Sequence, residues 1–299
     1  MKERKIGRRF LTAGLMILGI VFFSSEALPW GFATHVYIDD HIGKRHGVRN
    51  ADEIYGGVAP DIFIYLFGLS YRQDLINATH FKDYMNPWNT AGNGVERSLS
   101  FGFVSHNNTW GADFTAHNKC LTCGEPDGYV IAKAKAMLAY APLPPDLGIP
   151  DVAAIEIFHE LVEPAVDILI KREDPLIGLK LSSSAMLRSP QFPALMVRAY
   201  AGDVAALAGI SYPEAAGFIA AAEKEFRKNM ILYGQILTLE EETAVQLLSE
   251  QTADLAEAFL ASYGIQLDIP KKNVVELLVA YTNLAISLCA SDYLWEIDE

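Results

Sequence analysis

The segment PDVAAIEIFHELVEPAVDILIKR, residues 150–172, shows the helical pattern that recurs through most of this chain. Its apolar side chains recur at the three- and four-residue spacing of a helix, and a Pro-Asp pair opens it. We therefore predict a helix that runs from this pair towards Arg172. Pro164 interrupts the pattern, so we expect a bend or one missing backbone hydrogen bond there. His159 and Glu163 lie one turn apart on one face of this helix.

Helical periodicity also fills most of the remaining chain, and the alternating pattern of strands is almost absent. This predicts an all-α fold. The stretch Pro142–Pro150 contains four prolines and is predicted to be a linker. The other expected helices are Thr34–Arg45, Asn93–His117, Tyr129–Ala141, a helix that begins at Ser211, Glu240–Ser262 and Val274–Trp295. We expect one helical domain over residues 28–299, with a metal-ligand half at about 30–175 and packing helices at about 176–299.

The composition is that of a globular protein. Of 299 residues, 51% are hydrophobic and 20% are charged, and a chain of this length buries roughly three quarters of its unfolded surface. These values exclude a disordered chain, collagen and a disulfide-knotted miniprotein. The formal net charge is −13. Because such a surface repels polyanions, we expect no stable nucleic-acid partner.

The N-terminus resembles a signal peptide over residues 1–27. Five basic residues precede the apolar run Phe10–Phe23, and Ser25-Glu26-Ala27 offers small residues for cleavage. We therefore expect an exported protein, periplasmic or extracellular. The alternative is a membrane anchor through residues 10–23. Removal of five basic and two acidic side chains changes the net charge from −13 to −16.

The three cysteines do not form a zinc-binding pattern. Cys120 and Cys123 are a single Cys-x-x-Cys pair, and Cys289 lies far along the chain. A zinc ribbon needs a second pair. We expect a local disulfide or two free thiols at Cys120 and Cys123.

All seven histidines fall between positions 35 and 159. On a helix, His106, Asp113 and His117 would lie within about 20° of one direction. Imidazole nitrogens and carboxylate oxygens are the usual non-sulfur ligands of zinc. A lone His-x-x-x-Glu such as His159 and Glu163 is more often a solvent-facing pair or a satisfied core histidine. The His-Asp-His face lies among apolar side chains, however, where unpartnered polar groups are costly and a shared cation would supply partners.

The order of these residues resembles the zinc-dependent phospholipase C family, which is related to the single-strand-specific zinc nucleases. The resemblance covers Trp30 to Glu163. The matching positions are Trp30, His35, Asp61, His80, His106, Asp113, His117, His159 and Glu163. One position departs from the family, because Trp110 stands four residues after His106 where the family commonly has Asp. Glu163 favours the phospholipases, whereas the short spacing between Trp30 and His35 favours the nucleases.

The resemblance implies an all-α bundle around a multinuclear site of three Zn²⁺ ions, with these nine residues as metal ligands. Asp61 is implied as a ligand or as the base that takes a proton from water. Trp30 would bind zinc through a free α-amino group, which requires processing to Trp30. Small-residue rules instead favour a cut after Ala27. We therefore expect Leu28-Pro29 to be trimmed afterwards.

The implied activity is that of an exported phospholipase C-like phosphodiesterase. It would hydrolyse phospholipids, or another phosphodiester, to diacylglycerol and a phosphorylated head group, in contact with a membrane surface. One alternative is a nuclease or phosphomonoesterase on the same zinc site. A second is a non-catalytic, membrane-anchored helical envelope protein. His41 and His46 match no family position and are expected to be exposed. The apolar run Ile62–Phe67 is expected to be core, with lipid contact as its alternative.

Overall fold

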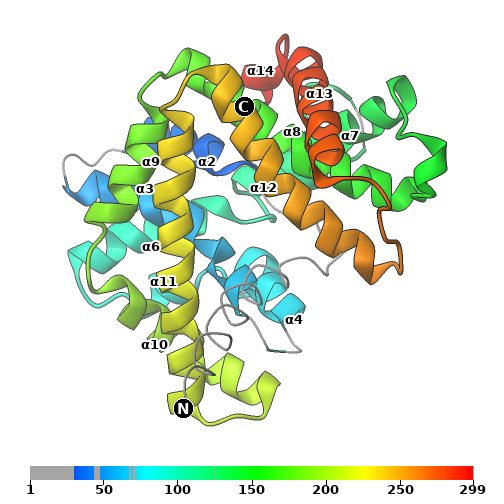
Figure 1. Cartoon of the computed structure of the whole chain (residues 1–299). Helices are drawn as coiled ribbons and strands as arrows, with labels where there is room; N and C mark the ends of the chain where they lie inside the picture. Colours follow the sequence, from blue (N-terminus) through cyan, green and yellow to red (C-terminus); the bar gives the residue numbers. More distant parts are fainter. Residues whose placement is uncertain (1–29, 44–47, 67–68, 70–71, 125, 299) are drawn as a thin grey trace, which may run out of the picture.

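The computed structural model describes residues 30–43, 48–66, 69, 72–124 and 126–298 (Figure 1). Their regular secondary structure is entirely helical, which confirms the all-α class. The expected signal peptide, its cleavage site and His46 lie outside the described residues.

The N-terminal half contains several short helices. They are α2 (Phe32–Ile42), α3 (Val48–Val58), the 3₁₀ helix η1 (Ala59–Tyr65), α4 (Arg72–Asn77), the π-helix η2 (Ala78–Lys82), α5 (Asn86–Thr90), α6 (Gly94–His106), the π-helix η3 (Phe114–Asn118), α7 (Tyr129–Tyr140) and the 3₁₀ helix η4 (Pro145–Leu147). Longer helices follow: α8 (Asp151–Glu173), α9 (Ile177–Leu187), α10 (Phe192–Ala208), α11 (Tyr212–Leu237), α12 (Glu241–Ser262), α13 (Lys271–Cys289) and the short α14 (Tyr293–Asp298).

The sequence pattern predicts both ends of α8 and α12 to within one residue, and it predicts the start of α11, but it does not mark α9 and α10. Helix α8 continues through Pro164 without a break. Proline lacks an N–H, so it removes only the hydrogen bond to the carbonyl four residues earlier. Helix α11 begins with a capping box, in which the Ser211 side chain accepts from the Glu214 N–H and the Glu214 carboxylate accepts from the Ser211 N–H.

Two expected helices are interrupted. The segment predicted as one helix over Asn93–His117 is divided into α6 and η3 by a turn at 107–111. The segment Val274–Trp295 is likewise divided into α13 and α14. In both cases helical periodicity continues across a change in chain direction.

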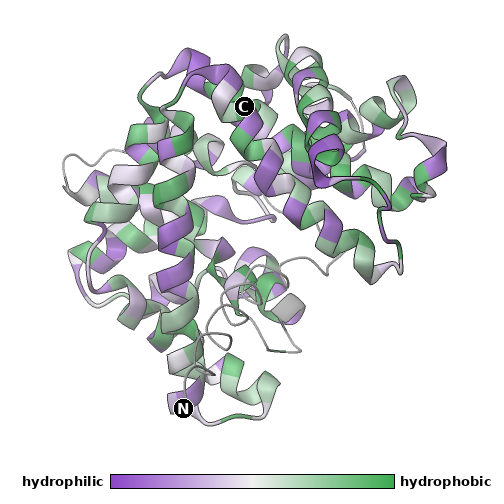
Figure 2. Ribbon diagram, viewed as in Figure 1, coloured by the Kyte–Doolittle hydropathy of each residue, from purple (hydrophilic) through white to green (hydrophobic). Residues whose placement is uncertain are grey.

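A continuous hydrophobic core extends from Trp30 to Tyr293, and α8 contributes many of its fully buried side chains. Most helices in Figure 2 carry both hydrophilic (purple) and hydrophobic (green) residues, as expected for helices that bury one face. Ile62, Phe63 and Leu66 are buried. The core interpretation of this apolar run is therefore confirmed for these three residues, for which the lipid-contact alternative is wrong, whereas Tyr65 is only partly buried.

Within the described residues, no single helix has the length and apolar composition needed to cross a membrane. The pair α10 and α11 meets the length and composition test together, but the two helices are bent by 116°. Cys120 and Cys123 form a disulfide, whereas Cys289 is a buried free thiol. The disulfide alternative for the Cys-x-x-Cys pair is thereby confirmed.

Candidate metal centre

Six helices bring eight of the nine expected ligands together. His35 comes from α2, Asp61 from η1, His80 from η2, His106 from the last turn of α6, Asp113 from the N-cap of η3, His117 from η3 itself, and His159 and Glu163 from α8. Seven of the eight residues are at most 6% exposed, and His117 is partly buried. Ionisable side chains are rarely buried to this extent without a partner.

The turn after α6 places Asp113, which the sequence pattern had assigned to the α6 helix itself. The Asn107 side-chain oxygen accepts from the N–H groups of Thr109 and Trp110. The N–H of Gly111 in turn donates to the Asn107 carbonyl. A Cβ on Gly111 would lie 2.3 Å from the Ser105 carbonyl oxygen, so glycine is required for this close approach. The expectation that His106, Asp113 and His117 share a helix face is therefore wrong, although the turn does bring Asp113 to His106.

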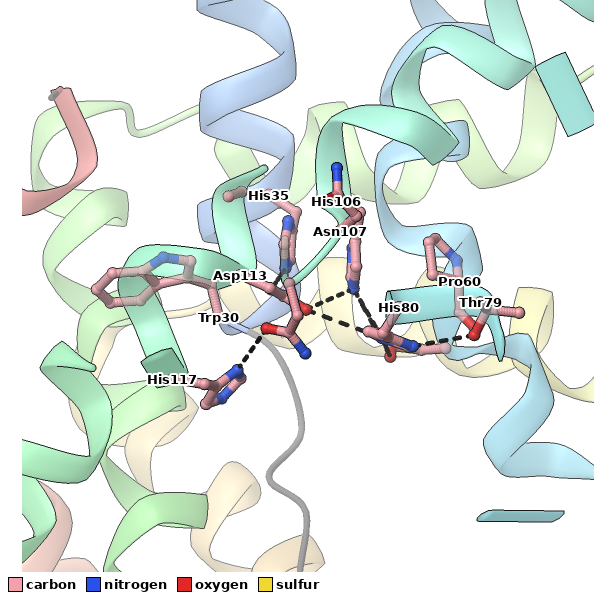
Figure 3. A network of polar contacts seen from close by, with 12 residues as sticks. Trp30, His35, Pro60, Thr79, His80, His106, Asn107, Asp113 and His117 are labelled. Atoms are coloured by element: carbon pink, nitrogen blue, oxygen red, sulfur yellow. Dashed lines mark hydrogen bonds and ion pairs between the residues drawn. The ribbon is translucent and has the colours of Figure 1, made fainter. Parts of the chain in front are cut away.

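The first group consists of His35, His106 and Asp113. Asp113 Oδ1 lies 3.1 Å from His35 Nε2, and its Oδ2 lies 3.1 Å from His106 Nε2. The two imidazole rings are stacked, with centroids 4.0 Å apart. Asp113 thus offers one oxygen to each histidine, as a bridging carboxylate would (Figure 3).

The second group consists of Asp61, His80 and His106. The Nε2 atoms of His80 and His106 are 3.1 Å apart. Asp61 Oδ1 lies 3.4 Å from His80 Nε2 and 4.0 Å from His106 Nε2. His106 belongs to both of these groups, so the first two groups adjoin one another.

The third group consists of His117, His159 and Glu163. The Nε2 atoms of the two histidines are 3.2 Å apart, and Glu163 Oε1 lies 3.0 Å from His159 Nε2. Glu163 Oε1 also lies 3.9 Å from His117 Nε2. The expected i, i+4 pair on α8 is therefore completed by a histidine from η3.

The positions of the ring protons of His80 and His106 support a cation between the Nε2 atoms of these two residues. His80 Nδ1 lies 2.9 Å from the Ile76 carbonyl oxygen, and His106 Nδ1 lies 2.6 Å from the Gly57 carbonyl oxygen. A carbonyl only accepts, so both Nδ1 atoms donate, and in the neutral tautomers both Nε2 atoms carry lone pairs. Two lone pairs 3.1 Å apart repel unless a proton or a metal ion lies between them. Metal-ligating histidines usually donate their other N–H to a carbonyl in this way.

Several buried atoms of the centre also lack hydrogen-bond partners within the described protein. These atoms are His35 Nε2, both carboxylate oxygens of Asp61 and of Asp113, His159 Nδ1 and Glu163 Oε1. Two ligands of one tetrahedral zinc ion, each about 2.1 Å from it, are separated by about 3.4 Å. The distances of 3.0 to 4.0 Å between neighbouring ligand atoms bracket this value, and all ligand atoms of each group lie within 4.8 Å of one another. The donor set and its spacing therefore fit zinc, and the three groups are compatible with a multinuclear site.

The histidines of the centre include two kinds, those whose pKa is raised and those whose pKa is lowered. Burial lowers the pKa of His106, but the charges of Asp113 and Asp61 outweigh it and raise the pKa to about 9. Burial of His159 is outweighed by Glu163 and Glu160, which raise its pKa to about 10. For His117 burial dominates and lowers the pKa to about 3. Without metal, His106 and His159 therefore keep protons at the positions where the ions would bind.

The pKa values of Asp113 and Glu163 are shifted by burial and by the histidines of the centre. Burial tends to raise the pKa of Asp113, but His106 and His35 hold it well below its usual range. Burial raises the pKa of Glu163 well above its usual range, against the opposing effect of His159. His159 and Glu163 together therefore retain a proton at neutral pH in the absence of metal.

The ninth expected ligand, Trp30, lies in the core at the edge of the centre. Its side chain is 1% exposed, and its Nε1 donates to Thr115 Oγ1, between Asp113 and His117 in the chain. Trp30 is not a member of the three groups. His41, in contrast, is exposed on α2, as expected.

Sequence reasoning missed the oxygen atoms that orient two of the ligands, one from the backbone and one from a side chain. Gly57 supplies the carbonyl that His106 Nδ1 contacts, and Asn108 Oδ1 lies 3.4 Å from His117 Nδ1. The Gly56-Gly57 pair was an available signal, because paired glycines in a helical pattern indicate close backbone approach. No comparable signal marks Asn108.

Comparison with protein-family models, curated proteins and solved structures finds no match for this chain.

Proposed function

We propose that this protein is an exported, zinc-dependent phosphodiesterase of the phospholipase C type, which hydrolyses phospholipids to diacylglycerol and a phosphorylated head group. The observation that carries the proposal is the convergence of eight largely buried side chains in three groups, with separations that suit zinc. Their order along the chain, which resembles the zinc-dependent phospholipases C, supports this choice. We further propose that the helices form the multi-helix bundle of that family.

The residues of the centre would act on a phosphodiester as follows. Bound zinc ions would polarise the phosphoryl oxygens and make water a better nucleophile near neutral pH. Asp61 is fully buried, and neither of its carboxylate oxygens has a hydrogen-bond partner among the residues that the structure describes. It is therefore placed to accept the proton of the attacking water. As water adds to phosphorus and gives its proton to Asp61, the bond to the glycerol oxygen breaks, and that oxygen takes a proton from solvent water and leaves as an alcohol.

The contacts of Trp30 support a further ligand in the processed protein. Its indole is held beside Thr115, two residues from both Asp113 and His117. An amide nitrogen is a poor ligand because its lone pair is delocalised, whereas a terminal amine with a pKa near ~8 readily loses its proton to a dication. We propose that processing to Trp30 supplies such an amine to the ion held by His35 and Asp113.

A second candidate is a nuclease or phosphomonoesterase on the same centre. The short spacing between Trp30 and His35 favours it, whereas Glu163 and the net charge of −13 weigh against it. The non-catalytic envelope protein remains the alternative from another class. It predicts a structural metal, or none, and no phosphodiester cleavage.

The test combines metal analysis with cleavage assays. The purified mature protein is assayed on phosphatidylcholine vesicles and on a single-stranded oligonucleotide, with and without a chelator. We expect more than one zinc per chain, because nine candidate ligands exceed the four of a tetrahedral ion. We also expect lipid cleavage that the chelator abolishes. A stoichiometry of zero or one contradicts the multinuclear proposal, and cleavage of the oligonucleotide alone favours the second candidate.

Three substitutions assign the activity to the centre. His159→Ala and Asp113→Asn each remove a zinc ligand and should lower turnover at least about 10²-fold. His41→Ala is the matched control, because His41 is exposed on the same helix as His35. It should leave turnover nearly unchanged. Equal losses in all three variants would contradict the assignment.

A further inference from the structure

Asp167 is a buried carboxylate beside the centre that belongs to none of its three groups. It lies on α8, four residues after Glu163 and eight after His159, which places the three side chains along one side of the helix. Its side chain is 0% exposed. Instead of facing the histidines, the carboxylate contacts the start of α2, the helix that carries His35.

Asp167 replaces the missing N-cap side chain of α2. The N-cap residue of this helix is Gly31, which has no side-chain acceptor. Asp167 Oδ2 accepts from the Ala33 N–H at 2.9 Å, and Oδ1 accepts from the Thr34 N–H at 2.8 Å. These are the two N–H groups that an N-cap side chain normally satisfies. A Cβ on Gly31 would lie 2.5 Å from Asp167 Cγ, so glycine leaves room for the carboxylate.

Two further hydrogen bonds complete this arrangement. The hydroxyl of Thr34 donates to Oδ1, and the hydroxyl of Tyr233 on α11 donates to Oδ2, both at 2.8 Å. Burial raises the pKa of Asp167 to about 6 against the opposing effect of these four donors. The carboxylate is therefore mostly ionised at neutral pH, and it joins α2, α8 and α11 at one point.

The position of His35 depends on the hydrogen bonds of the Asp167 carboxylate to α2. It directly follows Thr34, both of whose donors are bound to Asp167, and its Nε2 lies 3.1 Å from Asp113. His35 is also the one residue of the three groups that α2 supplies. His117, His159 and Glu163, in contrast, come from η3 and α8. A shift of α2 against α8 would therefore move His35 and leave the third group in place.

We propose that Asp167 is a positioning residue that holds α2 against α8 so that His35 and Asp113 bind one ion together. Loss of its charge removes this ion and leaves the ion of His117, His159 and Glu163 bound. The proposal rests on the proposed zinc centre. It also gives α11, one of the packing helices, a role in metal binding.

The test counts zinc ions per chain after dialysis against a weak competing chelator. Asp167→Asn keeps the size of the side chain, but its amide NH₂ replaces an acceptor with a donor. We expect it to bind one zinc fewer than the wild type, with the helical circular dichroism retained. Tyr233→Phe removes one donor of four, and it should weaken the most loosely bound zinc by about tenfold or less.

Glu296→Gln is the matched control. Glu296 is also buried and accepts from two backbone N–H groups, of Leu121 and Thr122, and from the Thr122 hydroxyl. It therefore makes the same kinds of bond from α14 to a loop that is not attached to α2. We expect this variant to lose stability while it keeps the wild-type zinc count.

The outcomes separate the two proposals. A wild-type protein that binds no zinc contradicts the zinc centre itself. A wild-type count in Asp167→Asn, or an equal loss in Glu296→Gln, overturns the positioning role. If Asp167→Asn does not fold, Thr34→Val, which removes only the hydroxyl donor, takes its place. It should weaken the most loosely bound zinc, and an unchanged affinity overturns the proposal.

Discussion

Zinc binding to this centre should release about two protons at pH 7. One comes from His106, whose pKa is raised to about 9 by Asp113 and Asp61 against the effect of burial. The other comes from the pair of His159 and Glu163, where the pKa of His159 is raised to about 10 against burial. A histidine binds metal only in its neutral form, so each ion must displace the proton that occupies its place. His117 adds none, because burial lowers its pKa to about 3.

The sign and size of the pH dependence follow from these protons. The metal-free protein holds them up to about pH 9 and 10, whereas the metal-bound protein does not. Binding is therefore weaker at low pH. Each displaced proton changes the apparent binding constant by about tenfold per pH unit below its pKa. For two protons, the overall constant should rise about 10²-fold between pH 6 and pH 7.

Isothermal titration calorimetry in two buffers of different ionisation enthalpy measures the number of protons released. Glu163→Gln removes the charge that lies 3.0 Å from His159 Nε2, so it should release about one proton fewer. His41→Ala should match the wild type, because His41 is exposed and outside the three groups. No proton release at pH 7, or an unchanged release in Glu163→Gln, would refute this reasoning.

Two further predictions concern the backbone around the centre and the N-terminus. Gly57→Ala places a Cβ 1.4 Å from Asp39 Oδ2, and it should lower the free energy of unfolding by about 3 kcal/mol in urea denaturation. Gly202→Ala in α10, where a Cβ meets no atom within 4 Å, should instead raise it by about 0.5–1 kcal/mol; a similar loss in both variants would count against the close packing. N-terminal sequencing of the purified active protein should find Trp30 first, and a stable start at Leu28 with full zinc loading would remove Trp30 as an amine ligand.

The sequence by itself determined the fold class, the extents of α8 and α12, and the start of α11. Helices α8, α11 and α12 follow from apolar periodicity and from local signals at their ends, such as the Ser211 and Glu214 capping box. These signals act over a few residues, so they can be read without knowing the fold. The pairing of His159 with Glu163 is local in the same way, because one helical turn brings them together.

The tertiary structure alone decided which residues could share an ion. His80 and His106 come from separate elements, and their Nε2 atoms meet at 3.1 Å because α6 packs against α3 and Gly57 offers its carbonyl to His106. Asp113 reaches His106 through a turn that the helical period conceals. Such contacts depend on how whole helices pack, which hydrophobic periodicity does not specify.

Asp167 is the clearest example of a contact that the sequence alone does not reveal. In the sequence it is one acidic residue on a helix, with no spacing that relates it to Gly31 or Thr34. Only the packing of α2 on α8 brings its carboxylate to the two N–H groups that a glycine N-cap leaves without a side-chain acceptor. Local chemistry thus determined which side chains can bind metal, and long-range packing decided where each of them lies, because helix packing joins residues more than a hundred positions apart.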